Sequence, residues 1–207
     1  ALVTHPHAVS AVHAAQAAAG VDVLTANTFR TTRRAWGPGW RAAAREAVGI
    51  ARGAAPPGVR VAGSIAPLED CYRPDLSPEH PGCEHALLAG VLAEAGCDLL
   101  LCETFPHAAE ALAAVRAGVS TGVPTWLALT AGPDADLLSP EAMGRAARAA
   151  VDAGAGAVLV NCVPAARTRV YVEALSGCGV PFGAYANAGA PAEGMGWGPA
   201  PSAGERY

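Results

Sequence analysis

The sequence contains no lysine, and all 14 of its basic residues are arginine. Schiff-base chemistry needs a lysine amine, and so does the phosphate-binding loop of P-loop nucleotide hydrolases. The absence of lysine therefore excludes both kinds of site from these 207 residues.

Several other signals are also missing. The first predicted strand is not followed by a G-x-G-x-x-G motif, and the six cysteines include no C-x-x-C pair. No apolar run approaches the ~20 residues of a membrane-spanning helix, and no signal peptide precedes the first predicted helix. The formal net charge of −4 offers no basic surface for nucleic acid or anionic lipid. These absences predict a cytoplasmic protein without a disulfide framework, a nucleic-acid partner or a membrane partner.

What the chain does have is a regular alternation of strands and helices. Apolar runs predict strands at 21–26, 59–62, 98–102, 125–129, 157–160 and 182–186. Helices are predicted at 6–19, 40–52, 84–95, 106–119, from 140 onward, and at 165–175. The segments 31–39, 66–82 and 188–204 are rich in Gly, Pro or Asp and are predicted to be irregular.

This alternation predicts a single α/β domain, 1–207, built on a parallel sheet. A closed (β/α)8 barrel is favoured over an open doubly wound sheet, because the dinucleotide-binding motif of the latter is absent. The chain begins on a predicted helix and ends on a predicted loop. We therefore expect the first strand and the last βα unit of the barrel to lie outside these residues.

Polar residues follow the predicted strands at their carboxyl ends. The segments 20–29 and 96–105 are near copies, each an apolar strand that ends in a polar residue, Thr and Phe. In 157–164, Asn161 and Cys162 follow the apolar run, and Pro164 is expected to stop the strand and open a helix. Because the carboxyl ends of parallel strands share one rim, we expect six polar residues to converge there. They are Asn27, Ser64, Glu103, Thr130, Cys162 and Asn187.

Two of these residues allow more than one interpretation. Cys162 could be a catalytic nucleophile, a metal ligand or a small buried hydrophobic residue. Glu103 follows an apolar run, and a buried carboxylate must be paired or have a perturbed pKa. Alternatively, Glu103 could cap the helix that is predicted to start near Pro106.

The histidines are not predicted to form a metal site. His5 and His7 superficially match the H-x-H of metal-dependent barrel hydrolases, but those enzymes also need histidines at later strand ends. This chain has threonine and cysteine there. We interpret His5 and His7 as helix-start residues, and His13 and His107 as packing or capping residues.

Five short motifs together resemble a known family. They are Thr-Ala-Asn-Thr-Phe at 25–29, Ala-Gly-Ser-Ile-Ala-Pro at 62–67, Cys-Glu-Thr at 102–104, Val-Asn-Cys at 160–162 and Ala-Asn-Ala-Gly at 186–189. In order and spacing the chain resembles the homocysteine S-methyltransferase family from about His5 to Trp197. That family includes enzymes that use S-methylmethionine or betaine, and the homocysteine module of methionine synthase. The resemblance implies a (β/α)8 barrel that transfers a methyl group from a small donor to homocysteine, giving methionine.

The resemblance also implies roles for particular residues. The family holds zinc with three cysteine thiolates, and Cys162 matches one of them, while Asn187 matches an asparagine near or on the metal. Zinc binds the homocysteine sulfur as the thiolate. Glu103 matches the residue that holds the substrate amino group, so Glu103 and Cys162 are the expected catalytic pair. The expected substrate-binding residues are Asn27, Thr28, Ser64, Glu103, Thr104 and Asn161.

The chain departs from the family pattern in two places. The other two zinc ligands form a Gly-Gly-Cys-Cys motif in the family, and these residues contain neither an adjacent cysteine pair nor the family's Asp-Gly motif. A catalytic zinc needs three protein ligands, so we expect Cys162 and Asn187 alone not to retain it, and weak order toward Tyr207. A non-catalytic or truncated relative and a hydrolase with Cys162 as nucleophile remain the alternatives. Neither the methyl donor nor the oligomeric state is indicated.

Overall fold

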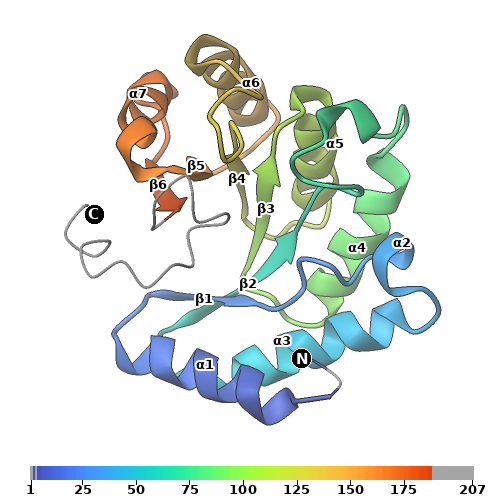
Figure 1. Cartoon of the computed structure of the whole chain (residues 1–207). Coiled ribbons are helices and arrows are strands. Elements are labelled where there is room, and N and C mark those ends of the chain that lie inside the picture. Colours follow the sequence, from blue (N-terminus) through green and yellow to red (C-terminus); the bar gives the residue numbers. More distant parts are fainter. Residues whose placement is uncertain (1, 3, 188–207) are drawn as a thin grey trace.

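Six parallel strands form one curled sheet in the computed structural model, which describes residue 2 and residues 4–187. The strands pair in sequence order, each in parallel with the next. They are β1 (Val23–Ala26), β2 (Arg60–Ile65), β3 (Leu99–Phe105), β4 (Thr125–Leu129), β5 (Ala157–Pro164) and β6 (Phe182–Asn187). The sheet bends into a half-barrel, with β1 and β6 at its two edges (Figure 1).

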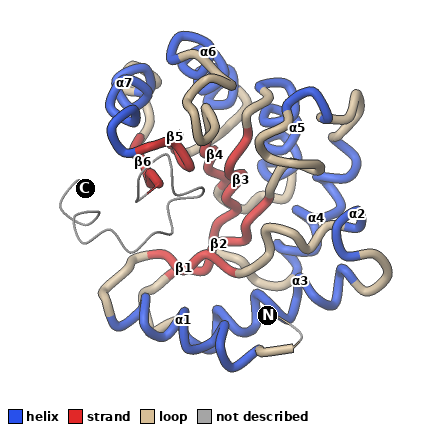
Figure 2. Tube along the Cα trace, viewed as in Figure 1, coloured by secondary structure: helices blue, strands red, loops and turns tan. Residues whose placement is uncertain are grey.

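Helices connect the strands and lie outside the curve of the sheet (Figure 2). They are α1 (Pro6–Ala18), α2 (Arg33–Trp36), α3 (Trp40–Ala54), α4 (Gly82–Glu94), α5 (Ala108–Val119), α6 (Pro140–Asp152) and α7 (Ala165–Leu175), with a 3₁₀ turn at Pro74–Leu76. Within the described part of the chain, no helix combines the length and the apolarity needed to cross a bilayer.

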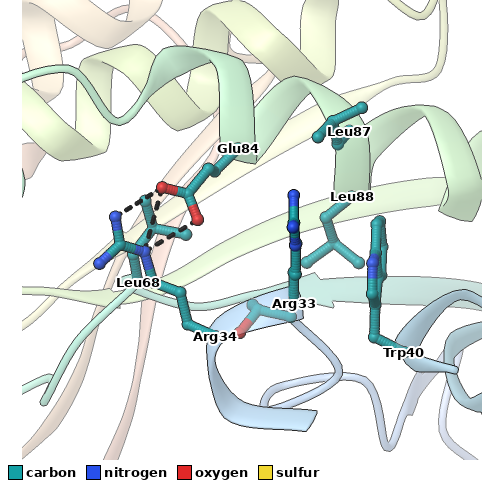
Figure 3. A pocket seen from close by; sticks show the side chains of 8 residues that line it. Arg33, Arg34, Trp40, Leu68, Glu84, Leu87 and Leu88 are labelled. Atoms are coloured by element: carbon teal, nitrogen blue, oxygen red, sulfur yellow. Dashed lines mark hydrogen bonds and ion pairs between the residues drawn. The ribbon is translucent and has the colours of Figure 1, made fainter. Parts of the chain in front are cut away.

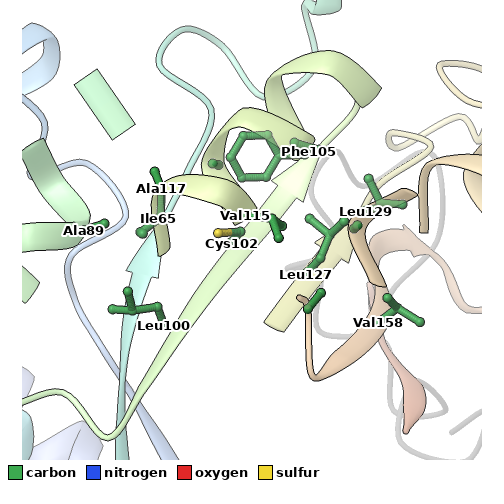
Figure 4. Close-up of a cluster of buried hydrophobic side chains, with 14 of the residues drawn as sticks. Ile65, Ala89, Leu100, Cys102, Phe105, Val115, Ala117, Leu127, Leu129 and Val158 are labelled. Atoms are coloured by element: carbon green, nitrogen blue, oxygen red, sulfur yellow. The ribbon is translucent and has the colours of Figure 1, made fainter. Parts of the chain in front are cut away.

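The two faces of the sheet carry different side chains, because neighbours along a strand point to opposite faces. On the outer face a large cluster packs against the helices, including Leu100, Cys102 and Phe105 of β3 (Figure 4). On the inner face a small cluster contains Leu99 and Leu101 of the same strand. Glu103 is in phase with the inner set, so the alternation directs its carboxylate to the concave side.

The order of the six predicted strands is confirmed, and three local predictions are wrong. β5 continues through Pro164 instead of stopping before it, after a register shift that begins at Asn161. The segment 31–39 contains the short helix α2, whose start is capped by the Thr32 side chain accepting from the amide of Ala35 at 3.2 Å. The sequence spacing of Leu87, Leu88, Val91 and Leu92 predicts one buried stripe on α4, but Leu87 is 46% exposed. The expectations for 188–207 lie outside the described residues.

Candidate functional site

The ends of β3 and β5 carry an unusual backbone. Both strands shift register there, between Cys102 and Phe105 and between Asn161 and Pro164. Thr104 has φ 64° and Cys162 has φ 53°. A β-branched residue such as threonine rarely adopts this left-handed region, and each such residue costs about 1–3 kcal/mol. Strain of this kind is concentrated at functional sites, which makes these two strand ends the first candidates.

The two strained residues contact each other. The Thr104 Oγ1 lies 4.0 Å from the Cys162 Sγ. The Asn161 amide nitrogen donates to Thr104 Oγ1 at 2.7 Å and to Cys162 Sγ at 3.4 Å. The Asn161 amide oxygen is buried and has no partner among the described residues. The arrangement therefore holds a thiol in place and leaves one buried acceptor atom beside it unpaired within the described residues.

Glu103 is held by two hydroxyl groups. Its Oε1 accepts from the Ser64 hydroxyl at 2.5 Å, and its Oε2 accepts from the Tyr185 hydroxyl at 2.7 Å. Burial raises the pKa of Glu103, while these two hydrogen bonds act in the opposite direction. The alternative that Glu103 caps the next helix is wrong, because the side chain of His107 caps α5 by accepting from the amide of Glu110.

Ser64 is itself fixed by Thr28. The Thr28 hydroxyl donates to the Ser64 carbonyl and accepts from the Ser64 amide, both at 2.8 Å. Both residues are buried. Thr28 thus uses its hydroxyl proton and one of its two lone pairs on the backbone of β2, and it positions Ser64.

A pocket of about 320 Å³ opens beside Glu103. Ser64 and Asn27 line it from the strand ends, and His13 lines it from α1. The His13 ring is 4% exposed, and neither ring nitrogen has a partner in the part of the chain that the structure describes. The sequence predicted a packing or capping role for His13, which its burial fits, but gave no sign of its unpaired nitrogens.

The segment 66–82, which connects β2 to α4, reaches Cys162 through Tyr72. Burial raises the pKa of the Cys162 thiol, hydrogen bonds from Thr104 and Tyr72 lower it, and the nearby Glu103 raises it. Tyr72 belongs to this segment and is half-buried. On the other side, Thr130 Oγ1 donates to the Cys162 carbonyl at 3.4 Å.

The structure brings the predicted strand-end residues to one rim. Ser64, Asn27 and Glu103 share a pocket, and Thr130 contacts Cys162. Asn187 ends β6 opposite Pro164 in the register. Sequence reasoning missed Tyr185 and Tyr72. Tyr185 lies two residues before Asn187, so the period-two alternation of a strand was the signal that could have placed it on the inner face.

The described residues do not fit a complete metal site. All six cysteines lie in the described part and are free. No group of three His, Cys, Asp or Glu side chains in residue 2 and residues 4–187 is arranged to hold a metal ion. A catalytic zinc takes three protein ligands, and amide oxygen is a poor substitute for thiolate. Cys162 and Asn187 together therefore fall short of the set that zinc needs.

Fold and site define an α/β protein with a curled parallel sheet and a carboxylate and a thiol at its carboxyl rim. The sequence profile described as homocysteine S-methyltransferase matches residues 1–206. The chain belongs to the homocysteine S-methyltransferase family.

Two curated relatives are similar in sequence. Over 165 residues the chain is 32% identical to the S-methylmethionine–homocysteine S-methyltransferase BHMT2 of Mus musculus, and 31% identical to that of Rattus norvegicus. Each match covers 78% of this chain and 44% of the relative. The chain thus spans less than half the length of these relatives.

Solved structures of the homocysteine methyltransferase MmuM from Escherichia coli have the same fold. The metallated form superposes with a TM-score of 0.80 at 23% identity, over 91% of this chain and 74% of that one. The oxidized form gives a TM-score of 0.72 at 18% identity, over 94% and 85%. At such identities the likeness concerns the fold alone.

Proposed function

We propose that this chain forms the homocysteine-binding part of a (β/α)8 barrel enzyme that methylates homocysteine to methionine. The observation that carries the proposal is Glu103, a partly buried carboxylate held by Ser64 and Tyr185 at the same rim as Cys162. A carboxylate in this setting is a strong acceptor for an ammonium group, because a charge-assisted hydrogen bond gains from the low local dielectric.

In the proposed reaction each residue has a defined task. Glu103 accepts hydrogen bonds from the ammonium group of homocysteine, and Asn27, Ser64 and Thr104 surround the amino acid. The Asn161 amide oxygen, which is buried and unpaired among the described residues, would accept a hydrogen bond from a second donor group of the substrate. The homocysteine sulfur, as thiolate, attacks the methyl carbon of the donor. A sulfur–carbon bond forms, and the bond from the methyl group to the donor heteroatom breaks with its electron pair leaving on the donor.

Zinc is the cofactor proposed for the whole protein, with Cys162 as one ligand and Asn187 near the metal. The described residues do not complete that ligand set, so the proposal requires two further thiolates. S-methylmethionine, which the names of the two rodent relatives contain, is the first donor to test. A cytoplasmic location, where thiols stay reduced, fits six free cysteines.

A hydrolase with Cys162 as nucleophile is less well supported. Such an enzyme needs a base within hydrogen-bonding reach of the thiol. Among the described residues, the groups that hydrogen-bond the Cys162 thiol are a threonine, an asparagine and a tyrosine, Thr104, Asn161 and Tyr72. None of these is a general base at neutral pH.

Replacing Cys162 by alanine tests the proposed function. Methionine formation from homocysteine and S-methylmethionine is expected to fall by at least about 100-fold in kcat/KM, the upper end of the loss for residues that only support a metal ligand. Cys83→Ala is the matched control, since Cys83 is an exposed free thiol. Full activity in Cys162→Ala, or no methionine from the folded native protein with any donor, contradicts the proposal and favours a non-catalytic relative.

A further inference from the structure

We propose that Glu110, on the outer helix α5, is a positioning residue that holds the segment 66–82 over Cys162. This inference rests on the proposed function for its catalytic meaning. It assigns a role at the same site to Glu110, a residue that lies on the outer side of the sheet.

Glu110 joins the segment at two points. Its side chain is 2% exposed, and its Oε1 accepts from the amide of Leu68 at 2.8 Å. Its Oε2 accepts from the hydroxyl of Ser77 at 2.6 Å. Leu68 and Ser77 flank Tyr72, the residue whose hydroxyl contacts Cys162. One carboxylate therefore closes the base of the loop whose tip reaches the thiol.

A buried histidine completes this anchor. His85 of α4 is 0% exposed, and its Nε2 lies 3.2 Å from Glu110 Oε1. Burial alone would raise the pKa of Glu110, but the hydrogen bonds from His85, Ser77 and Leu68 bring it below its ordinary value. The carboxylate is thus ionised, and charge-assisted hydrogen bonds in a buried setting are among the strong ones. Removing it would leave three donors without their acceptor.

Leu68 and Cys71 also anchor the segment by burial, but its other charged attachments are exposed. Arg34 pairs with Glu69 at 2.6 Å, with side chains 40% and 39% exposed. The same guanidinium also binds Glu84 of α4 beside a pocket of about 460 Å³ (Figure 3). Exposed ion pairs contribute little to stability, because water and salt screen the two charges. Glu110 is therefore the main polar anchor of the segment.

Between its anchors the segment is stiffened by local hydrogen bonds. The amide of Tyr72 donates to Asp70 Oδ1 at 2.8 Å, and the amide of Arg73 donates to the Asp70 carbonyl at 3.0 Å. A stiff tip on a fixed base keeps the Tyr72 hydroxyl in one place above the thiol. Glu110 thereby controls how closely a small electrophile, such as a methyl donor, can approach the sulfur side of the rim.

The alkylation rate of Cys162 tests this inference without requiring methyl transfer. Iodoacetamide labelling, read peptide by peptide in a mass spectrometer, is expected to accelerate about tenfold at Cys162 in Glu110→Ala. Ser77→Ala, which removes one of the two hydrogen bonds between Glu110 and the segment, is expected to accelerate Cys162 labelling about threefold. Glu110→Gln is expected to restore most of the protection, because an amide can accept from Leu68 and donate to the Ser77 oxygen.

Two controls separate positioning from general destabilisation. Asp75→Asn breaks only the exposed Arg73–Asp75 pair within the same segment and should leave the Cys162 rate unchanged. Cys102, which is 0% exposed, should stay unlabelled in every folded variant. Labelling of Cys102 in Glu110→Ala would mean that this variant is partly unfolded. In that case the Cys162 labelling rate of the milder Ser77→Ala variant tests the inference.

A second pair of variants tests whether Glu110 acts through Tyr72. In a Tyr72→Ala background, Glu110→Ala is expected to add little to the Cys162 rate, because the group it positions is already gone. The inference is overturned by an unchanged Cys162 rate in a folded anchor variant, or by an equal acceleration with and without Tyr72. Failure of the proposed function would appear differently, as a native protein that makes no methionine yet shows the labelling pattern above.

Discussion

Replacing Glu103 by glutamine is expected to weaken homocysteine binding and to stabilise the free protein. The affinity should fall at least about tenfold, since a charge-assisted hydrogen bond worth about 1.5–3 kcal/mol is lost. The free energy of unfolding at pH 7 should rise. Burial raises the pKa of Glu103, so the folded state carries a cost for the ionised carboxylate that glutamine does not have.

The sign of the stability effect fixes its pH dependence. A carboxyl with a raised pKa in the folded state costs nothing below its unfolded pKa of about 4.3. The cost grows as the pH rises through the folded pKa. The stability difference between Glu103→Gln and the native protein should therefore be small near pH 4 and larger at pH 7. Urea unfolding across this range measures it, and calorimetric titration with homocysteine measures the affinity.

Glu79→Gln is the control for both measurements, because the Glu79 side chain is 90% exposed. It should change neither stability nor affinity. Unchanged homocysteine affinity in Glu103→Gln, together with lower stability, would mean that Glu103 has a structural role.

Phe105→Ala is expected to cause the largest loss of stability, about 3–5 kcal/mol. Phe105 lies two residues beyond Glu103 but on the outer face of β3, where it is 0% exposed within the large core cluster (Figure 4). Its ring also lies 5.7 Å from that of His85, at an interplanar angle of 60°. Alanine would leave a cavity between the sheet and α4, and a rigid core relaxes only partly around such a gap.

Phe182→Ala is the matched control, because the Phe182 side chain is 46% exposed at the start of β6. Its effect should stay within about 1 kcal/mol. Chemical denaturation of both variants gives the comparison. A Phe105→Ala protein as stable as Phe182→Ala would contradict the assignment of the outer face of β3 to the core.

Much of the fold follows from local pattern. The strand at 125–129 and the helix at 165–175 are predicted to the residue, since both are continuous periodic runs with clear stops. The Ser139 cap is likewise predictable, and its side chain accepts from the amide of Ala142 at 3.2 Å. The four-residue helix α2 is too short to show a period, so the sequence could not reveal it.

The site is less predictable, because its geometry depends on contacts between distant strands. The resemblance singled out Glu103 and Cys162, and alternation placed Glu103 on the inner face. The hydrogen bond from Tyr185 to Glu103 forms only because the sheet curls until β6 approaches β3, 82 residues earlier. The left-handed backbone of Thr104 and Cys162 arises from register shifts that no local preference encodes.

A crystal structure of the protein with bound homocysteine tests the central claim most directly. The account predicts the amino nitrogen of homocysteine within about 3.2 Å of a Glu103 carboxylate oxygen, with the sulfur directed toward the Cys162 side of the rim. The claim would be contradicted if homocysteine bound elsewhere and Glu103 kept only its hydrogen bonds with the Ser64 and Tyr185 hydroxyls.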